Sequence, residues 1–511
     1  MLSRLLALVL LGATSSLEAQ QVMASRTMIE AIEQHGSSGT SLEPASTPVP
    51  MLMSMHKGWQ LMLHSNAFVA DTQQQANSPR NKDAFFSTNW IMPMAQRGFG
   101  DRGQLGQLTL RAMLSFEPGT VPHRNYPELF QQGETAYGTP IIDGQHPHDF
   151  WMELAALYDV KLSRNTLLSF YVAPVGDPAI GPTAYPHRQS ASEDPIAALG
   201  HHQQDSTHIA FNVVTGGLAY RWARVELSGF HGAEPTEAHW HFEPSSNGHA
   251  IDSVATRLTV SPSADWSGQY SFAHITSPEA LYPGEDQQRQ TASVMYHHTF
   301  RSRPFSPHAG MSMATRSDGG ATPQGAAATP HDMSHMADMP GMDMSGMSDM
   351  GARTPANSSA APPHSSMSDP GRDSGMRSMR MVPEPTLDFS STLVWGRTRS
   401  LHDNGKQNSY LGEALLRFAS NNYLWTRVEN AGRSSELLLT PGTPLPPGFS
   451  EEPLGHVAAY SLGYDHDLRL GPRVLVAPGA QLTVYRAPEM LRASYGATPT
   501  AELFFVRFRL R

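Results

Sequence analysis

The sequence predicts an all-β protein, a transmembrane antiparallel β-barrel of about sixteen strands (about 12 to 18) that is interrupted by a disordered insertion. Three observations predict this class: a period-two alternation of apolar and polar residues, a sorting of connections into short and long ones, and the composition. Apolar residues make up 39% of the chain, and the mean hydropathy is -0.36. This polarity is too high for a helical membrane protein. It is ordinary for a barrel, in which every second strand residue faces a polar lumen.

The N-terminus has the pattern of a secretory signal peptide over residues 1–19. Arg4 supplies the positive charge, an apolar run extends from Leu5 to Leu11, and Ala19 ends a small-residue cleavage site. The run is too short to span a membrane, and no later run has the apolar length of a transmembrane helix. We therefore expect an exported protein. Because cysteine is absent, its stability must come from packing and hydrogen bonds rather than from disulfides.

The alternating pattern recurs along most of the chain. In residues 107–116, for example, leucine, alanine and phenylalanine share one face, whereas Gln107, Thr109 and Arg111 share the other. Each segment is close to the roughly nine to eleven residues that a tilted membrane strand needs. The expected strands begin near residues 59, 83, 105, 151, 165, 206, 217, 250, 265, 288, 386, 408, 421, 456, 472 and 500.

The connections between these strands are of two kinds, which alternate along the chain. Those after even-numbered strands are mostly tight and lie at residues 162–165, 215–217, 261–265, 420–422 and 469–472. Those after odd-numbered strands include long ones at residues 117–150, 175–205, 232–249 and 433–455. Outer-membrane barrels have short periplasmic turns and long outer loops. A soluble β-sandwich has no reason to sort its loops in this way.

The last segment, "AELFFVRFRLR", resembles the closing strand of bacterial outer-membrane proteins. Phe504, Val506, Phe508 and Leu510 form one face, and arginines occupy the other. The chain ends on Arg511 rather than on an aromatic residue. The resemblance therefore implies the architecture of a barrel. It implies less about the C-terminal signal that the assembly machinery of such barrels recognises.

Residues 301–385 break the alternating pattern. Ser, Pro, Gly, Ala, Met and Asp dominate there, which predicts disorder, because such a segment cannot bury enough apolar area to offset its ordering entropy. Ten expected strands precede this insertion, so strand parity places it in the periplasm. The expected organisation is a signal peptide at 1–19, an N-terminal periplasmic segment at 20–58, and a barrel whose two parts, 59–300 and 386–511, flank the insertion.

Within the insertion, "HDMSHMADMPGMDMSGMSDM" concentrates methionine, histidine and aspartate in a segment that has no core to enter. Thioether sulfur is a soft ligand that suits Cu(I) and, by the same softness, Ag(I). A flexible run of such side chains predicts several overlapping metal sites. The alternative is a low-complexity linker that happens to be rich in methionine. The candidate ligands are His331, Met333, His335, Met336, Met339, Met342, Met344, Met347 and Met350.

Histidines also cluster in the expected outer loops. His146 and His148 form one H-x-H pair, and His239 and His241 form another. In extended backbone such a pair points both imidazoles to one face, which suits Cu(II) or Zn(II). The alternative for each cluster is a set of polar residues that pack and hydrogen-bond over the barrel mouth.

Charged residues on the polar faces of the expected strands are predicted to point into the lumen. Both signs occur, so neither cation nor anion selectivity follows. They either line a water-filled pore or, as we expect, form Arg–Glu pairs across a filled lumen. The residues are Arg111, Glu153, Asp159, Arg224, Glu226, Arg257, Glu413, Arg417, Arg427 and Glu429.

Several classes of protein are not favoured by the sequence. The net charge of -10 argues against a nucleic-acid partner, because phosphate binding needs a basic face. No nucleophile elbow, zinc-protease motif or phosphate-binding glycine loop occurs in the chain. We therefore expect no enzyme and no required cofactor, with Cu(I), Cu(II) or Ag(I) as the ions that the chain would bind.

In architecture the chain resembles porin-like barrels. By its Met/His/Asp-rich segment it also resembles the copper-resistance protein B family. Those proteins likewise join such a segment to an outer-membrane barrel and are associated with copper sequestration or efflux, although their segment usually precedes the barrel. The resemblance implies an outer-membrane protein of a Gram-negative-type bacterium that handles copper or silver. Outer-membrane lipid, metal ions or small solutes, periplasmic metal carriers and a second copy of the chain are its expected partners.

Two other functions stay open. One is a general porin or small-solute channel with an incidental methionine-rich linker, and the other is a soluble periplasmic metal-binding β-protein. A conductance that is indifferent to copper would favour the first. Fractionation away from membranes without detergent would favour the second.

Overall fold

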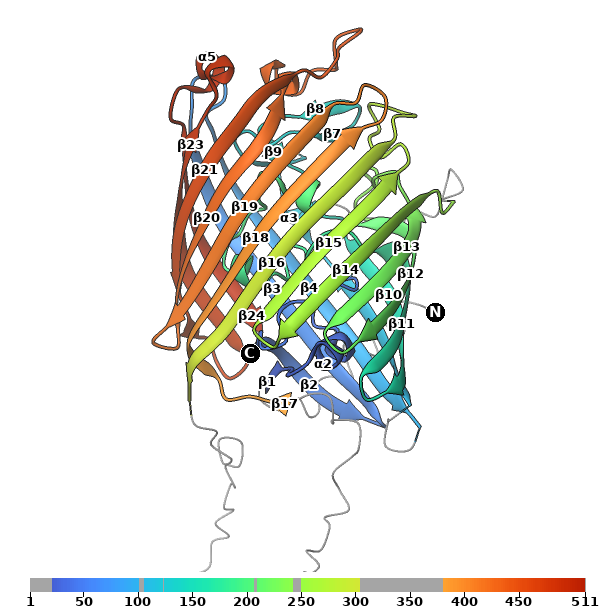
Figure 1. Cartoon of the computed structure of the whole chain (residues 1–511). Coiled ribbons are helices and arrows are strands. Elements are labelled where there is room, and N and C mark those ends of the chain that lie inside the picture. The colour runs from blue at the N-terminus through green and yellow to red at the C-terminus, as the bar shows by residue number, and fades with distance from the viewer. Residues whose placement is uncertain are drawn as a thin grey trace, which may run out of the picture. The chain divides into compact units, whose positions relative to one another are not determined.

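A computed structural model describes residues 21–100, 105–122, 124–205, 209–241, 250–303 and 380–510. Sixteen strands pair antiparallel with their neighbours, and the last pairs with the first, which closes the barrel (Figure 1). The predicted fold class is thus confirmed. The wall strands are β3 (Trp59–Gln75), β4 (Lys82–Phe99), β5 (Gly106–Leu114), β10 (Trp151–Ser163), β11 (Thr166–Gly176), β12 (Ala210–Tyr220), β13 (Ala223–His231), β14 (Ser253–Ser263), β15 (Trp266–Ile275), β16 (Gln287–Ser302), β18 (Pro385–Ser400), β19 (Lys406–Phe418), β20 (Asn422–Ser434), β21 (Pro453–His466), β23 (Val474–Arg486) and β24 (Thr500–Leu510).

Shorter elements lie in the connections and before the first wall strand. The short strands are β1 (Gln21–Ala24), β2 (Val49–His56), β6 (Tyr126–Pro127), β7 (Glu134–Ala136), β8 (Thr139–Ile141), β9 (Gly144–Gln145), β17 (Arg380–Met381) and β22 (Leu468–Arg469). The helical elements are α2 (Met28–Gln34), α3 (Glu117–Thr120), η2 (Gln189–Ala191), α4 (His201–Gln204), η5 (Ser435–Leu438), η6 (Glu489–Leu491) and α5 (Arg492–Tyr495). None of the described helices is long and apolar enough to cross a membrane.

The alternation along the strands separates a polar inner face from an apolar outer face. On β14, Ser253 and Arg257 are buried inside the barrel, whereas Val254 and Leu258 are exposed on its outside. The same holds around the wall, where large apolar side chains point outward: Leu110, Phe170, Val172, Leu218, Leu227, Val294, Leu393, Val428, Leu462 and Phe504. An apolar band of this kind is the surface that a membrane barrel presents to lipid.

The ends of the barrel differ in the length of their connections. At one end, turns such as residues 164–165, 221–222 and 264–265 are short, and at the other the chain makes connections as long as 115–150 and 177–209. We call these the short-turn end and the long-loop end. The sorting of connections that the sequence predicted is therefore present.

One predicted turn is wrong. Residues 215–217 were expected to connect two strands, but they lie inside β12, and the turn falls at Arg221 and Trp222. The reason is a close contact rather than a bend: a Cβ atom on Gly217 would lie 2.7 Å from Ser169 Oγ and 3.1 Å from Arg224 Nε. Glycine within a strand often marks such a close approach.

The insertion joins the wall at the short-turn end. β16 ends at Ser302 and β18 begins at Pro385, and the C-terminal end of β24 lies at the same end of the barrel (Figure 1). Residues 304–379 lie outside the described residues, and so do the signal peptide and the whole tract 331–350. The predicted disorder and metal binding of that segment therefore stay predictions.

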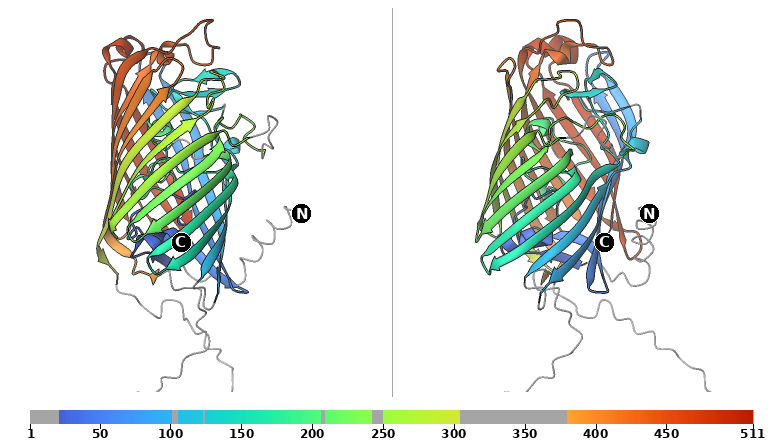
Figure 2. Two further views of the ribbon diagram at one scale, coloured as in Figure 1. Left: turned by 45° about the vertical axis from the view of Figure 1, so that its right-hand side comes forward. Right: turned by 90° about the vertical axis from the view of Figure 1, so that its right-hand side faces the viewer.

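The N-terminal segment enters the lumen, which the sequence analysis did not foresee. β1 pairs with β2 and with β17, and β2 pairs with β3 of the wall. Figures 1 and 2 show β1 and α2 within the short-turn end of the barrel, where β2 runs along the start of β3. Most side chains between residues 23 and 48 are buried. We call residues 21–56 the plug.

Candidate functional site

The inner wall carries paired charges, as the sequence analysis expected. Arg111 Nε lies 2.6 Å from Glu153 Oε2. Glu226 bridges two arginines, with Arg224 Nη2 at 3.2 Å and Arg257 Nε at 2.9 Å. All five of these side chains are buried. Burying charge is tolerated only when the charges are paired and hydrogen-bonded, so these pairs let the wall keep ionised groups inside the barrel.

The same arginines hold the plug. Arg111 donates hydrogen bonds to the main-chain oxygens of His35 (3.1 Å), Ser37 (2.5 Å) and Gly39 (2.6 Å). Arg224 donates to the main-chain oxygen of Thr40 at 2.8 Å, and Arg257 donates to its hydroxyl, also at 2.8 Å. Arginine has five donors in a fixed fork, so each of these side chains can bind a wall carboxylate and the plug at once.

Gly39 fixes how closely the plug fits. Its φ is +59°, and a Cβ atom there would lie 2.5 Å from Asp177 Cβ. Its N–H donates to Glu153 Oε1 at 2.9 Å. Only glycine combines this backbone conformation with so close an approach. The main chain of the plug therefore lies directly against the wall carboxylate and the start of the next long connection.

That connection, between β11 and β12, also folds into the lumen, and we call its residues 177–205 the inner loop. Arg188 lies between Glu413 Oε2 (Nε at 2.8 Å) and Asp205 Oδ2 (Nη1 at 2.9 Å) and is fully buried. Asp194 pairs with Arg427 at 3.1 Å, and Glu193 pairs with Arg507. The inner loop thus binds the wall through its own charged side chains.

A cavity of about 120 Å³ lies between the plug, the inner loop and the wall. Its lining includes His64 and Trp90 from the wall, His187 from the inner loop, and Asp388 and Arg509 near the short-turn end. The cavity is thus bordered by both inserted segments as well as by the wall.

Three of the four loop histidines proposed as metal ligands each contact a different carboxylate. His146 Nε2 lies 3.7 Å from Glu134 Oε1, and His148 Nδ1 lies 2.9 Å from Glu117 Oε2. His239 Nδ1 contacts Asp149. His241 is exposed, and its neighbours at 242–249 lie outside the described residues.

The structure does not bring the imidazoles of His146 and His148 together as one pair. The chain there is not a regular strand, Pro147 separates the two residues, and each imidazole meets a different carboxylate. The structure instead brings His146 close to His239, with ring centroids 6.0 Å apart and nearly parallel. The polar-loop alternative describes His148 better than metal ligation does.

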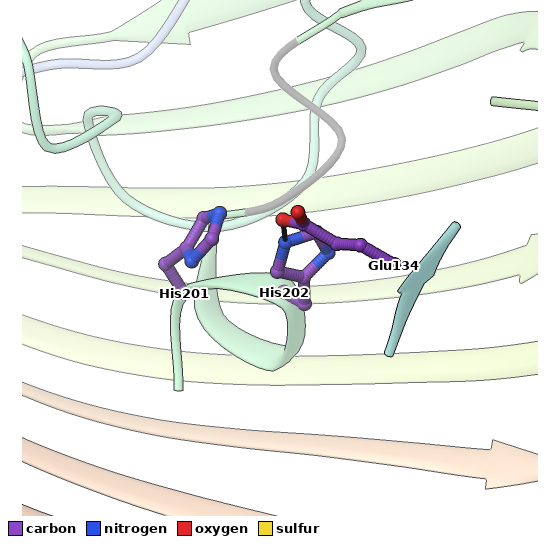
Figure 3. A group of neighbouring side chains, drawn as sticks. All are labelled: Glu134, His201 and His202. Carbon is purple, nitrogen blue, oxygen red and sulfur yellow. Dashed lines mark hydrogen bonds and ion pairs between the residues drawn. The ribbon is translucent and has the colours of Figure 1, made fainter. Parts of the chain in front are cut away.

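A group of possible metal ligands does form nearby, from residues that the sequence analysis did not combine. Glu134 on β7 and His201 and His202 on α4 place one ligand atom each within 4.8 Å of one another (Figure 3). His202 Nε2 contacts Glu134 Oε1, and the His201 and His202 rings are 4.0 Å apart. Two imidazoles and a carboxylate suit Zn(II) or Cu(II). We call Glu134, His146, His201 and His202 the outer cluster.

Charge holds the outer cluster together. Burial alone would raise the pKa of Glu134, but His146 and His202 outweigh it and lower this pKa to about 2. Burial acts to lower the pKa of His146, but Glu134, together with the Pro147 carbonyl, Asp149 and Glu234, raises this pKa above the usual value. The sequence named His146 as a ligand but missed Glu134. The signal in the sequence that could have located this cluster is the pair of adjacent histidines, His201 and His202, in a long loop.

Comparisons with known proteins give only distant likenesses. No family model matches the chain, and no curated protein matches it. The resemblance to the copper-resistance protein B family thus gains no support. Among solved structures, an anion-selective porin from Comamonas acidovorans is 9% identical with a TM-score of 0.44, covering 88% of this chain and 99% of that one.

Two further solved structures are similar to the same extent. Salmonella typhi OmpF, in complex with daunomycin, is 7% identical with a TM-score of 0.43, covering 89% of this chain and 99% of its own. OmpT, an outer membrane protein of Vibrio cholerae, is 6% identical with a TM-score of 0.38 and the same coverage. These likenesses concern the barrel alone, and the lumen of this chain has to be interpreted from its own residues.

Proposed function

We propose that this chain is a porin-like channel for small solutes in the outer membrane of a Gram-negative-type bacterium, closed by its N-terminal plug. A closed barrel with an apolar outside and a charged inside is the architecture that such a channel requires. The apolar outer face also disfavours the soluble β-protein. Outer-membrane lipid and small polar solutes are the partners that this function implies, and no catalytic activity is part of it.

One observation carries the proposal: the three wall arginines that donate to the plug also have carboxylate partners on the wall itself. Arg111 retains Glu153, and Arg224 and Arg257 retain Glu226, because the plug offers them mainly main-chain oxygens. Withdrawing the plug therefore leaves no unpaired wall arginine among these three. In a water-filled lumen the freed N–H groups would bind water at little cost.

The test is the conductance of the full chain in planar bilayers as urea is raised. Urea solvates peptide groups, so it should release a segment that is held by hydrogen bonds to its main chain before it unfolds the barrel. We expect low conductance without urea and a reversible rise at urea concentrations at which the β-sheet circular dichroism is unchanged. Absence of conductance up to the unfolding of the barrel would contradict a channel.

A second candidate function is the capture of soft metal ions by residues 331–350, favoured by the seven methionines in that tract. It is tested by titrating Cu(I) into the detergent-solubilised protein against a competing chelator, beside a variant that lacks His331–Met350. Loss of several bound equivalents with unchanged circular dichroism would support capture. Equal binding by both proteins would make the tract a linker.

A further inference from the structure

Eight buried methionines gather at the junction of the plug and the wall. They form one cluster of touching side chains, each at most 4% exposed. The plug contributes three of them and the neighbouring wall strands β3, β4, β5 and β10 contribute five. The members, which we call the luminal methionine cluster, are Met23, Met51, Met53, Met62, Met92, Met94, Met113 and Met152.

The strand register explains why these side chains meet. Met53 on β2 is paired with Met62 on β3, and Met62 is paired with Met94 on β4. Directly paired residues of adjacent strands have Cβ atoms about 4.5–5.5 Å apart. Three thioethers thus lie side by side on the inner face, one from the plug and two from the wall.

Packing alone is a poor explanation for this composition. Met is an adaptable filler of cores, so one or two at a junction would need no comment. The only other member of the luminal methionine cluster is Trp90, and it contains no buried Leu, Ile, Val or Phe. The three largest clusters elsewhere in the described lumen consist of aliphatic and aromatic residues and contain no methionine.

Two histidines border the cluster and face the cavity. His187 Nε2 lies 3.2 Å from Met113 Sδ, and the Trp90 ring packs beside both imidazoles, with ring centroids 4.7 Å from His64 and 4.3 Å from His187. The Nδ1 atoms of both histidines are buried and have no hydrogen-bond partner among the described residues. A buried polar atom without a partner calls for an explanation, and a bound ion is one.

The distance between the two imidazoles fits a shared ion. Their ring centroids are 5.8 Å apart. Two imidazoles on one ion, with metal–nitrogen bonds of about 2.0–2.1 Å, can have centroids up to roughly 6.4 Å apart. A small ion in the cavity could therefore reach both histidines, and the thioether of Met113 lies beside one of them.

We propose that this junction is a binding site for a soft monovalent ion, Cu(I) or Ag(I), and that such ions are the substrate class of the channel. The transport role rests on the proposed function, whereas the binding does not. Thioethers and imidazoles select Cu(I)-like ions, and hard cations prefer oxygen ligands. Because the luminal methionine cluster contains side chains of both plug and wall, an ion bound at its border lies next to the junction that separates when the plug leaves.

The site is tested by titrating Ag(I), which needs no reductant, into the detergent-solubilised full chain against a competing thioether chelator. The variant carries Met53→Leu, Met94→Leu and Met113→Leu, because leucine conserves the volume of methionine but has no thioether. Met28→Leu is the matched control, since Met28 is equally buried but packs in a separate cluster on α2. A third protein carries Met342→Leu, Met344→Leu and Met347→Leu in the tract.

We expect the luminal triple variant to lose at least one tight Ag(I) equivalent, alone and in combination with the tract variant. Met28→Leu should bind as the wild type does. Unchanged Ag(I) binding by the luminal triple variant, with and without the tract changes, would overturn the site. A titration with Zn(II) should not distinguish the luminal variant from the wild type.

A conductance measurement on the same proteins separates the site from the function. Ag(I) should alter the conductance of the wild type in urea and leave that of the luminal triple variant unchanged. If Ag(I) binding is lost in the variant but no protein conducts, the proposed channel fails and the site stands. If the channel conducts and Ag(I) has the same effect on both proteins, soft ions are not its substrate class.

Discussion

The plug and the inner loop both fill the lumen, but the wall holds them by different chemistry. The plug presents mainly main-chain oxygens to wall arginines that already have carboxylate partners, as Arg111 has Glu153. The inner loop presents charged side chains, as Arg188 does between Glu413 and Asp205.

Removing the inner loop would separate the pairs that Arg188, Glu193 and Asp194 make with the wall. Removing the plug would separate the His35–Asp159 and Glu33–Lys161 pairs and the ladder between β2 and β3. The inner loop is therefore held by more buried charge, and we infer that the plug is the segment that moves.

The largest expected effect is on the inner loop. Arg188→Leu removes a fully buried cation, so that the buried Asp205 loses its ion-pair partner and Glu413 keeps only Arg427. Breaking a buried pair from one side costs about 3–5 kcal/mol. We expect a correspondingly lower urea midpoint of barrel unfolding, measured by circular dichroism. A midpoint within error of the wild type would contradict a fixed inner loop.

A smaller effect is expected on the plug. Thr40→Val keeps the shape of the side chain but removes the hydroxyl to which Arg257 donates, while Arg257 keeps Glu226. A hydrogen bond to a charged group contributes about 1.5–3 kcal/mol. We expect conductance to appear at lower urea, with the unfolding midpoint of the barrel nearly unchanged. If the urea concentration at which conductance appears and the urea midpoint of barrel unfolding decrease equally, plug and barrel are one cooperative unit.

The smallest effect is a pH dependence at the long-loop end, where Glu134 and His146 meet the last residues of the inner loop. The pKa of Glu134 is lowered, so its contribution is present above the ordinary value of 4.5 and is lost as the pH falls towards 2. The pKa of His146 is raised, so its contribution is complete below 6.5 and is lost as the pH rises through the folded value. The outer cluster should therefore be most stable between about pH 4.5 and 6.5.

Melting temperatures of the wild type and of Glu134→Gln, measured across this range, test that expectation. The variant should lose the stability maximum. Glu489→Gln, at an exposed carboxylate of the same end, should keep it. A maximum that survives in Glu134→Gln would mean that other groups cause the pH dependence.

The wall was predictable from the sequence, because lipid imposes the same alternation on every strand. The segment expected near residue 500 begins at Thr500, and the one expected near 151 begins at Trp151. The segment expected near 217 begins only at Ala223, since glycines inside β12 resemble a turn. Period-two patterns thus locate strands well and their ends less well.

The filling of the lumen was not predictable in the same way. Arg111 was expected to face inward, but its partner Gly39 is 72 residues away along the chain, and Arg188 is 225 residues from Glu413. No local pattern reports such contacts. The luminal methionine cluster did leave a signal, because "MLMSM" and "IMPM" place methionine at every second position. Its importance becomes apparent only when the strands are set side by side.

The central claim, that the plug is the movable closure, is tested most directly by two glycine substitutions. Gly39→Ala forces a Cβ atom against Asp177, whereas a Cβ atom at Gly58 would meet nothing within 4 Å, and both residues have a positive φ. The backbone strain is therefore similar and only the contact differs. Single-channel recording without urea should show Gly39→Ala open about tenfold more often than the wild type, as a displacement worth about 1.4 kcal/mol would give, with Gly58→Ala unchanged. Equal open probabilities for all three proteins would contradict the account.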